Sequence, residues 1–146
     1  MRRLFLFNPE NDIALGSGLP RITPPRQAGL LHRAGAMLPF WLGEEGDSVI
    51  VAPEDLTAAT AWRKEIAEIT GVTGPWPVAE CSPGEELTPS PWGWSRDAAW
   101  QFMKAAGCGD VFEGEIVEVA SNGPITLKLR SGKLRVFNFK EVVAVI

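Results

Sequence analysis

The strongest constraint on the fold is the unbroken apolar run at residues 4–7, which is followed at once by Asn8 and Pro9. A strand that is buried on both faces has such a run, whereas a strand with one solvent-exposed face alternates apolar and polar residues. Asn and Pro then favour a turn. The sequence therefore predicts a central parallel strand near the N-terminus. A second apolar run at 48–52, which ends at Pro53, predicts a second buried strand beside the first.

Three stretches have helical spacing of apolar residues, at about 25–41, 55–70 and 95–107. The first lies between the two predicted strands, so it predicts a right-handed βαβ unit. The second is expected to stop at Gly71, and the third to begin after Ser95 as its N-cap. Residues 72–78 contain two prolines and predict at most an edge strand. Residues 79–93, rich in Pro, Ser, Gly and Glu, predict a loop.

After Gly109 the apolar period changes to two, in segments at 111–119, 125–130, 133–139 and 142–146. Asn122-Gly123 and Ser131-Gly132 are suited to tight turns, since these residues tolerate positive φ. The predicted fold class is thus α/β. A Rossmann-like three-layer front with a parallel sheet (1–108) is followed by a small antiparallel β meander or SH3-like barrel (109–146).

Composition narrows the classes of function. A formal net charge of -4 creates no overall positive potential that would attract nucleic acid, so nucleic acid is not expected as a partner. The two cysteines lie far apart and lack His or Cys neighbours at ligand spacing, so neither a metal site nor a disulfide framework is expected. The first apolar run is too short for a signal peptide and no run is long enough to cross a membrane. These patterns predict a cytoplasmic protein, and no motif identifies a cofactor or a catalytic residue.

The polar segment after the first strand is the main candidate site, because open α/β sheets bind ligands beyond the carboxyl ends of their strands. It comprises Asn8, Glu10, Asn11 and Asp12. Two carboxylates and two amides at this place are suited to a small polar ligand. The alternative is a turn in which these side chains satisfy main-chain groups.

Two further segments are candidates for the same crevice. Arg26 follows a glycine-bearing segment at 16–18 whose main-chain amides are suited to approach an anion, although a flexible connector is the simpler explanation of that composition. Trp92, Trp94 and Ser95 precede a predicted helix and are suited to stacking a ring beside main-chain amides, with a packed aromatic corner as the alternative. His32 is expected on a helix surface, and the acidic residues at 44–47 in a solvated turn.

The predicted β tail carries four basic residues around its second tight turn: Lys128, Arg130, Lys133 and Arg135. A two-residue turn would place Arg130 opposite Lys133 and Lys128 opposite Arg135. Like charges opposite one another cost stability, so an anionic partner is one interpretation. The alternative is a balanced surface, since acidic residues on neighbouring segments are available to neutralise it.

Four motifs in order resemble the start of certain bacterial ATP-grasp-type proteins, a pre-ATP-grasp, Rossmann-like domain, over about residues 1–108. They are FNPENDIAL at 7–15, TPP at 23–25, LP at 38–39 before Trp41, and PWGWS at 91–95. In such families this domain helps to shape a substrate cleft, while a following ATP-grasp domain supplies the nucleotide and magnesium sites. Residues 109–146 are too few for that domain, so the resemblance implies ligand binding without ligase activity of this chain alone.

The sequence therefore predicts an accessory or non-catalytic binding protein that holds a small polar ligand at the loop after the first strand. A first alternative is the substrate-binding part of a carboxylate-amine ligase that acts with a separate catalytic chain. A second is an adaptor that binds nucleic acid or another protein through the basic hairpin.

Overall fold

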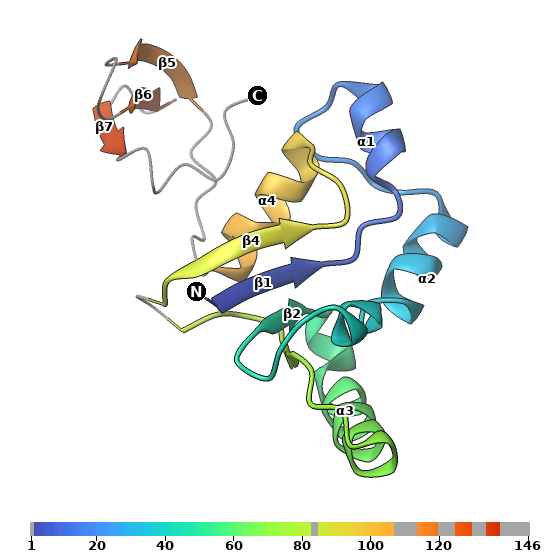
Figure 1. The fold of residues 1–146 in the computed structure, drawn as a ribbon. Helices are drawn as coiled ribbons and strands as arrows, with labels where there is room; N and C mark the ends of the chain where they lie inside the picture. The colour runs from blue at the N-terminus through green and yellow to red at the C-terminus, as the bar shows by residue number, and fades with distance from the viewer. Residues whose placement is uncertain (1, 83–84, 107–113, 120–124, 130–133, 138–146) are drawn as a thin grey trace.

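The computed structural model describes residues 2–82, 85–106, 114–119, 125–129 and 134–137. Its front part is built on a four-stranded sheet in the order β3-β2-β1-β4 (Figure 1). The first strand, β1 (Arg2–Leu6), lies between β2 (Ser48–Ile50) and β4 (Leu87–Pro91), and β3 (Trp76–Val78) is the edge strand beyond β2. All three pairings are parallel. The predicted α/β fold with a central first strand is confirmed, and it is Rossmann-like.

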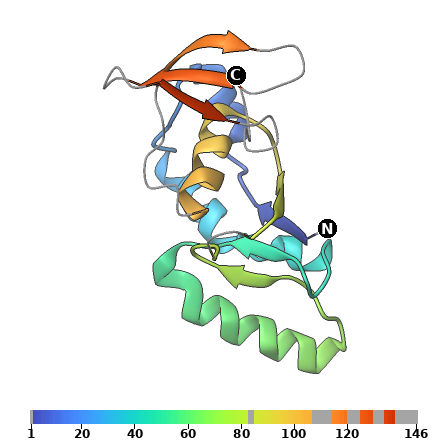
Figure 2. The same cartoon turned by 90° about the vertical axis from the view of Figure 1, so that its left-hand side faces the viewer.

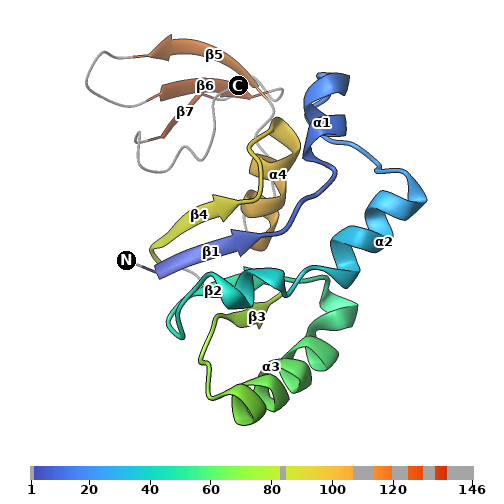
Figure 3. The ribbon, with the colours of Figure 1, turned by 45° about the vertical axis from the view of Figure 1, so that its right-hand side comes forward.

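Helical segments lie between β1 and β2, between β2 and β3, and after β4. In chain order they are α1 (Asn11–Ser17), α2 (Arg26–Ala34), the 3-10 turns η1 (Leu38–Trp41) and η2 (Pro53–Asp55), α3 (Leu56–Thr70) and α4 (Arg96–Ala105). Helix α3 ends at Gly71 and α4 begins after Ser95, as the sequence predicts. Figures 2 and 3 show α3 lying alongside β3.

The alternating side chains of β1 supply the core on both faces of the sheet. Leu4 and Leu6 form a buried cluster with Ala98 and Phe102 of α4. Phe5 and Phe7 point to the opposite face, where the ring of Phe7 lies so close to Gly35 that a Cβ there would come within 2.4 Å of it. Because other elements cover both faces of β1, neither side of the apolar run at 4–7 is exposed to solvent.

Two predictions about the first crossover are wrong. The predicted helix over 25–41 is divided, because α2 ends at Ala34 and a separate turn, η1, follows. Gly35, which packs too closely against Phe7 to carry a side chain, is the C-cap at which α2 ends. The glycine-bearing segment at 16–18 is not a flexible connector, because it is the end of α1, with Gly18 at a φ of 65° as its cap.

Strand β4 replaces residues 87–91 of the loop predicted at 79–93. It pairs with β1 along its whole length, with Leu4 opposite Pro89 and Leu6 opposite Pro91. The N–H of Trp92 donates to the carbonyl oxygen of Leu6 at 2.8 Å. Since N–H groups alternate in direction along a strand, the positions of Pro89 and Pro91 face away from β1, where no N–H is needed for this pairing. The prolines therefore fit an edge strand.

Asp47 is buried, contrary to the predicted solvated turn at 44–47. Its carboxylate accepts hydrogen bonds from the Arg3 main chain at 2.8 Å, from the Arg3 guanidinium at 2.8 and 3.1 Å, and from the main chain of Glu44 at 2.9 Å. Burial raises the pKa of Asp47, but these donors lower it more, and the pKa lies below its ordinary value. The interaction joins the start of β1 to the turn before β2.

The tail contains three strands in the described residues: β5 (Gly114–Val119), β6 (Ile125–Leu129) and β7 (Leu134–Phe137). They pair antiparallel in the order β5-β6-β7. Lys128 is opposite Leu134 and Leu127 is opposite Arg135. The predicted pairing of Lys128 with Arg135 is therefore wrong by one residue. Arg130, Lys133, both predicted turns and the strand at 142–146 lie outside the described residues. The barrel and the boundary at 108 stay predictions.

We expect Asp47→Asn to lower the free energy of unfolding at pH 7 by roughly 1.5–3 kcal/mol, because charged hydrogen bonds are lost. The pKa of Asp47 is lowered on folding, so its contribution is complete above the unfolded pKa and is lost as the pH falls through the folded value. The difference between the variant and the parent should shrink in acid. Urea unfolding at pH 7 and at about pH 3 measures it. Glu44→Gln, at an exposed neighbour, should change little.

Candidate functional site

The sheet reverses its order beside β1. The chain passes from β1 to β2 and β3 on one side, and then returns to β4 on the other side of β1. Open parallel sheets bind ligands beyond the carboxyl ends of the strands at such a reversal. In this protein that place lies beyond β1 and β4, where residues 7–12 and 92–95 follow the two strands (Figure 3). The two main predicted motifs therefore meet in space.

Asn8 joins the two strand ends. Its side-chain amide donates to the carbonyl oxygen of Gly93 at 2.8 Å, and its side-chain oxygen accepts from the N–H of Gly93 at 3.1 Å. The amide also lies 3.3 Å from Oδ1 of Asn11. Only 2% of Asn8 is exposed. Its polar atoms are thus matched inside the protein, and Asn8 is a structural residue that holds the site together.

The segment after β4 is a packed corner with open ring faces. Gly93 lies against Asn11 so closely that a Cβ at position 93 would come within 2.4 Å of its side chain. Trp92 packs edge-on against Phe7 at 5.5 Å, and Trp94 packs against Phe102 at 5.6 Å. These two tryptophans nevertheless remain 64% and 45% exposed. The rings therefore form the packed aromatic corner that the sequence offers as the alternative, and they also present surface, while stacking on a ligand stays a prediction.

Ser95 and Asp97 organise the start of α4. The hydroxyl of Ser95 accepts from the N–H of Ala98 at 3.1 Å, which makes it the N-cap. Asp97 is buried and accepts from the main chain of Ile22 and from the amide of Gln101, both at 2.9 Å. The oxygen of Ser95 is therefore used by its own helix.

Glu10 and His32 form a partly buried pair between the loop after β1 and α2. Nδ1 of His32 lies 2.7 Å from Oε1 of Glu10. A carboxylate only accepts, so the ring nitrogen is the donor. Glu10 is 4% exposed and its second oxygen, Oε2, is buried with no hydrogen-bond partner. The sequence predicts His32 on a helix surface; it does lie on α2, but it is partly buried against Glu10.

The environment of Glu10 favours its ionised form. Burial raises the pKa of Glu10, but the hydrogen bond from His32, main-chain hydrogen bonding and the proximity of the Gln101 amide lower it more. The pKa consequently lies below its ordinary value, and Glu10 carries a negative charge at neutral pH. An ionised, buried oxygen without a hydrogen-bond donor lowers the stability of the folded state. This is the chemical feature that distinguishes Glu10 from the rest of the segment.

The other charged residues of the predicted site are exposed. Asp12 is exposed on α1, whereas Glu10 is buried. Arg26 is exposed at the first position of α2. Among the described residues, no group of three or more His, Cys, Asp or Glu side chains is arranged to hold a metal ion. None of the helices in the described ranges has the length and apolar character needed to cross a membrane.

Comparisons with protein-family models, with curated proteins and with solved structures give no match for this chain. The fold assignment therefore rests on the sheet order, the parallel pairing and the helices of the chain itself.

Sequence reasoning missed the Glu10–His32 pair. The two residues are 22 positions apart and lie on different elements, so no local spacing connects them. A single histidine together with a carboxylate at a strand end is the only signal that was present.

We expect Asn8→Ala to destabilise the fold by roughly 2 kcal/mol, because a main-chain donor and acceptor of Gly93 lose their partner. Chemical unfolding followed by tryptophan fluorescence measures this loss. Asp12→Ala is the matched control, since Asp12 is exposed in the same segment. Equal stability of the two variants would contradict the structural role of Asn8.

Proposed function

We propose that this protein binds a small polar molecule at the loop after β1, with the carboxylate of Glu10 as the group that recognises it. The observation that carries the proposal is the buried Oε2 of Glu10, which has no hydrogen-bond partner although its neighbour Oε1 is paired with His32. A ligand that brings a hydrogen-bond donor to Oε2 removes the cost of that unpaired oxygen. Its position at the reversal of strand order supports the same conclusion.

Local charge favours a cationic donor, and we propose a primary amine. Glu10 is ionised, and the buried Asp97 and the exposed Asp12 add negative charge on neighbouring elements. An ammonium group has three donors and a positive charge, which match a carboxylate that already has one oxygen occupied. An anionic ligand would meet repulsion here.

The two tryptophans provide surface for the rest of the ligand. Gly93, between them, contacts Asn11, the residue after Glu10. Trp92 packs against Phe7 and Trp94 packs against Phe102, and both tryptophans keep exposed area. Aromatic faces attract ammonium groups and pack against aliphatic stems. The proposed ligand is therefore a small amine with an apolar or ring-bearing body.

Titration calorimetry with ethanolamine, putrescine and agmatine, against acetate and succinate, tests this proposal. We expect the parent protein to bind an amine and not the carboxylates. Glu10→Gln keeps the shape of the side chain but removes its charge, so amine affinity should fall at least tenfold, about 1.4 kcal/mol. Asp12→Asn removes a charge from the exposed side of the same segment and should change affinity much less.

Equal amine binding by Glu10→Gln and the parent would refute the proposal, as would the absence of binding to every amine. A purely structural role of Glu10 predicts a different pattern. In that case Glu10→Gln would lower the melting temperature without altering any binding isotherm.

The resemblance to a pre-ATP-grasp domain supports a second candidate, the substrate-binding part of a ligase that works with a separate catalytic chain. The order 3-2-1-4 places two of the resembling motifs, at 7–15 and 91–95, beside each other beyond β1 and β4. A co-purifying chain that hydrolyses ATP only in the presence of this protein and an amine would favour this candidate. ATP turnover that is indifferent to Glu10→Gln would argue against it.

A further inference from the structure

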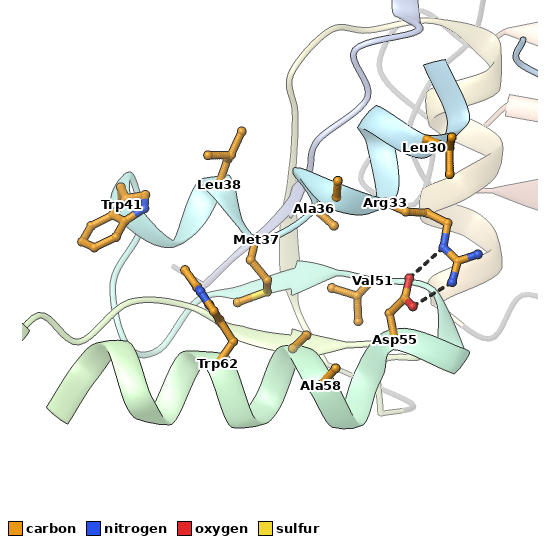
Figure 4. Close-up of a pocket in the computed structure, with 12 residues that line it drawn as sticks. Leu30, Arg33, Ala36, Met37, Leu38, Trp41, Val51, Asp55, Ala58 and Trp62 are labelled. Atoms are coloured by element: carbon orange, nitrogen blue, oxygen red, sulfur yellow. Dashed lines mark hydrogen bonds and ion pairs between the residues drawn. The ribbon is translucent and has the colours of Figure 1, made fainter. Parts of the chain in front are cut away.

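An apolar groove lies between α2 and η1 on one side and α3 on the other (Figure 4). Its volume is about 480 Å³. Val51, directly after β2, contributes to the lining, so the groove also lies at the carboxyl edge of the sheet. The lining is mainly apolar and includes Leu38, Trp41, Ala58 and Trp62, with Arg33 and Asp55 as its polar members.

One end of the groove is a fixed aromatic wall. Phe40 is fully buried, and the rings of Trp41 and Trp62 pack edge-on against it at 5.0 and 5.4 Å. This packing restricts both indole rings, because the ring between them has no room to move. Trp41 is still 50% exposed, and the neighbouring rim residue Leu38 is 51% exposed. Large apolar side chains that are held in place yet open to solvent indicate a surface with an occupant.

The opposite end of the groove carries charges that are already paired. The guanidinium of Arg33 donates to both oxygens of Asp55 at 2.8 and 2.7 Å. Glu54 lies 3.5 Å from the same guanidinium. The hydrogen bonds from Arg33 hold the pKa of Asp55 below its ordinary value. A charged ligand would have to break this bidentate pair, whereas a neutral one would not.

We propose that this groove is a second binding site, which takes a small, neutral and largely apolar molecule with its ring against Trp41 and Trp62. The volume lies within the range of about 300–1,000 Å³ that is usual for small-molecule sites, and such sites are lined mainly by apolar and aromatic groups with a few polar ones. The internally neutralised charges favour a neutral occupant over an ionic one. This site does not depend on Glu10, so the two proposals fail separately.

The neutral fluorescent probe N-phenyl-1-naphthylamine tests the proposal on the whole chain. We expect saturable enhancement of its emission, with energy transfer from tryptophan. Ala58→Phe fills the groove from α3 and should weaken binding at least tenfold. Ala61→Phe is the matched control, because Ala61 is also an exposed alanine of α3 but does not line the groove. It should bind the probe like the parent, as should Glu10→Gln.

A second pair of variants tests the other wall. Leu38→Asp places a carboxylate on the rim, and Leu42→Asp places one at a residue that is 63% exposed and outside the lining. Only the first should reduce affinity, and circular dichroism establishes that each variant folds. If neither groove variant changes binding, or if the parent does not bind the probe, the proposal is wrong. A dimer in sedimentation velocity that Ala58→Phe converts to a monomer would also overturn it, because the occupant would then be a second copy of the chain.

Discussion

The arrangement of this protein depends on the side-chain amide of Asn8, which extends the pairing of β1 and β4 beyond the last main-chain hydrogen bond. That bond runs from the N–H of Trp92 to the carbonyl oxygen of Leu6, and the amide of Asn8 then forms two more with Gly93. An amide side chain has the donor and acceptor of a peptide group, so it can stand in for one. The two loops that follow these strands are thereby held together, and Glu10 is placed between α1, α2 and α4.

Side-chain hydrogen bonds do for α2 what buried apolar residues do for α4. No residue of α2 is buried. Its last turn instead carries two adjacent residues that bond in different directions, His32 to Glu10 and Arg33 to Asp55 at the start of α3. Because consecutive residues of a helix point about 100° apart, one turn reaches both neighbours. Helix α2 therefore borders both proposed sites, with His32 at the polar one and Arg33 at the apolar one.

The two proposed sites differ in what the protein leaves unsatisfied. At Glu10 the unmatched group is an ionised oxygen, and the cost of burying it is electrostatic. In the groove the charges are matched, and the unmatched feature is apolar area on Trp41 and Leu38. The first favours a cationic donor and the second a neutral, apolar body. Both lie at the carboxyl edge of the sheet, where the strands end and their connections leave concave surface.

The sequence by itself determined the features that depend on neighbours along the chain. These include the burial of β1 on both faces, the extent of α3 and α4, the end of α3 at Gly71 and the cap at Ser95. Apolar period and capping act within a few residues, so they can be read locally. The tertiary structure alone decided that residues 87–91 form a strand, that Asp47 is buried with Arg3, and that Glu10 meets His32. These depend on partners 22 or more positions away, and only the path of the folded chain brings such groups within hydrogen-bonding distance.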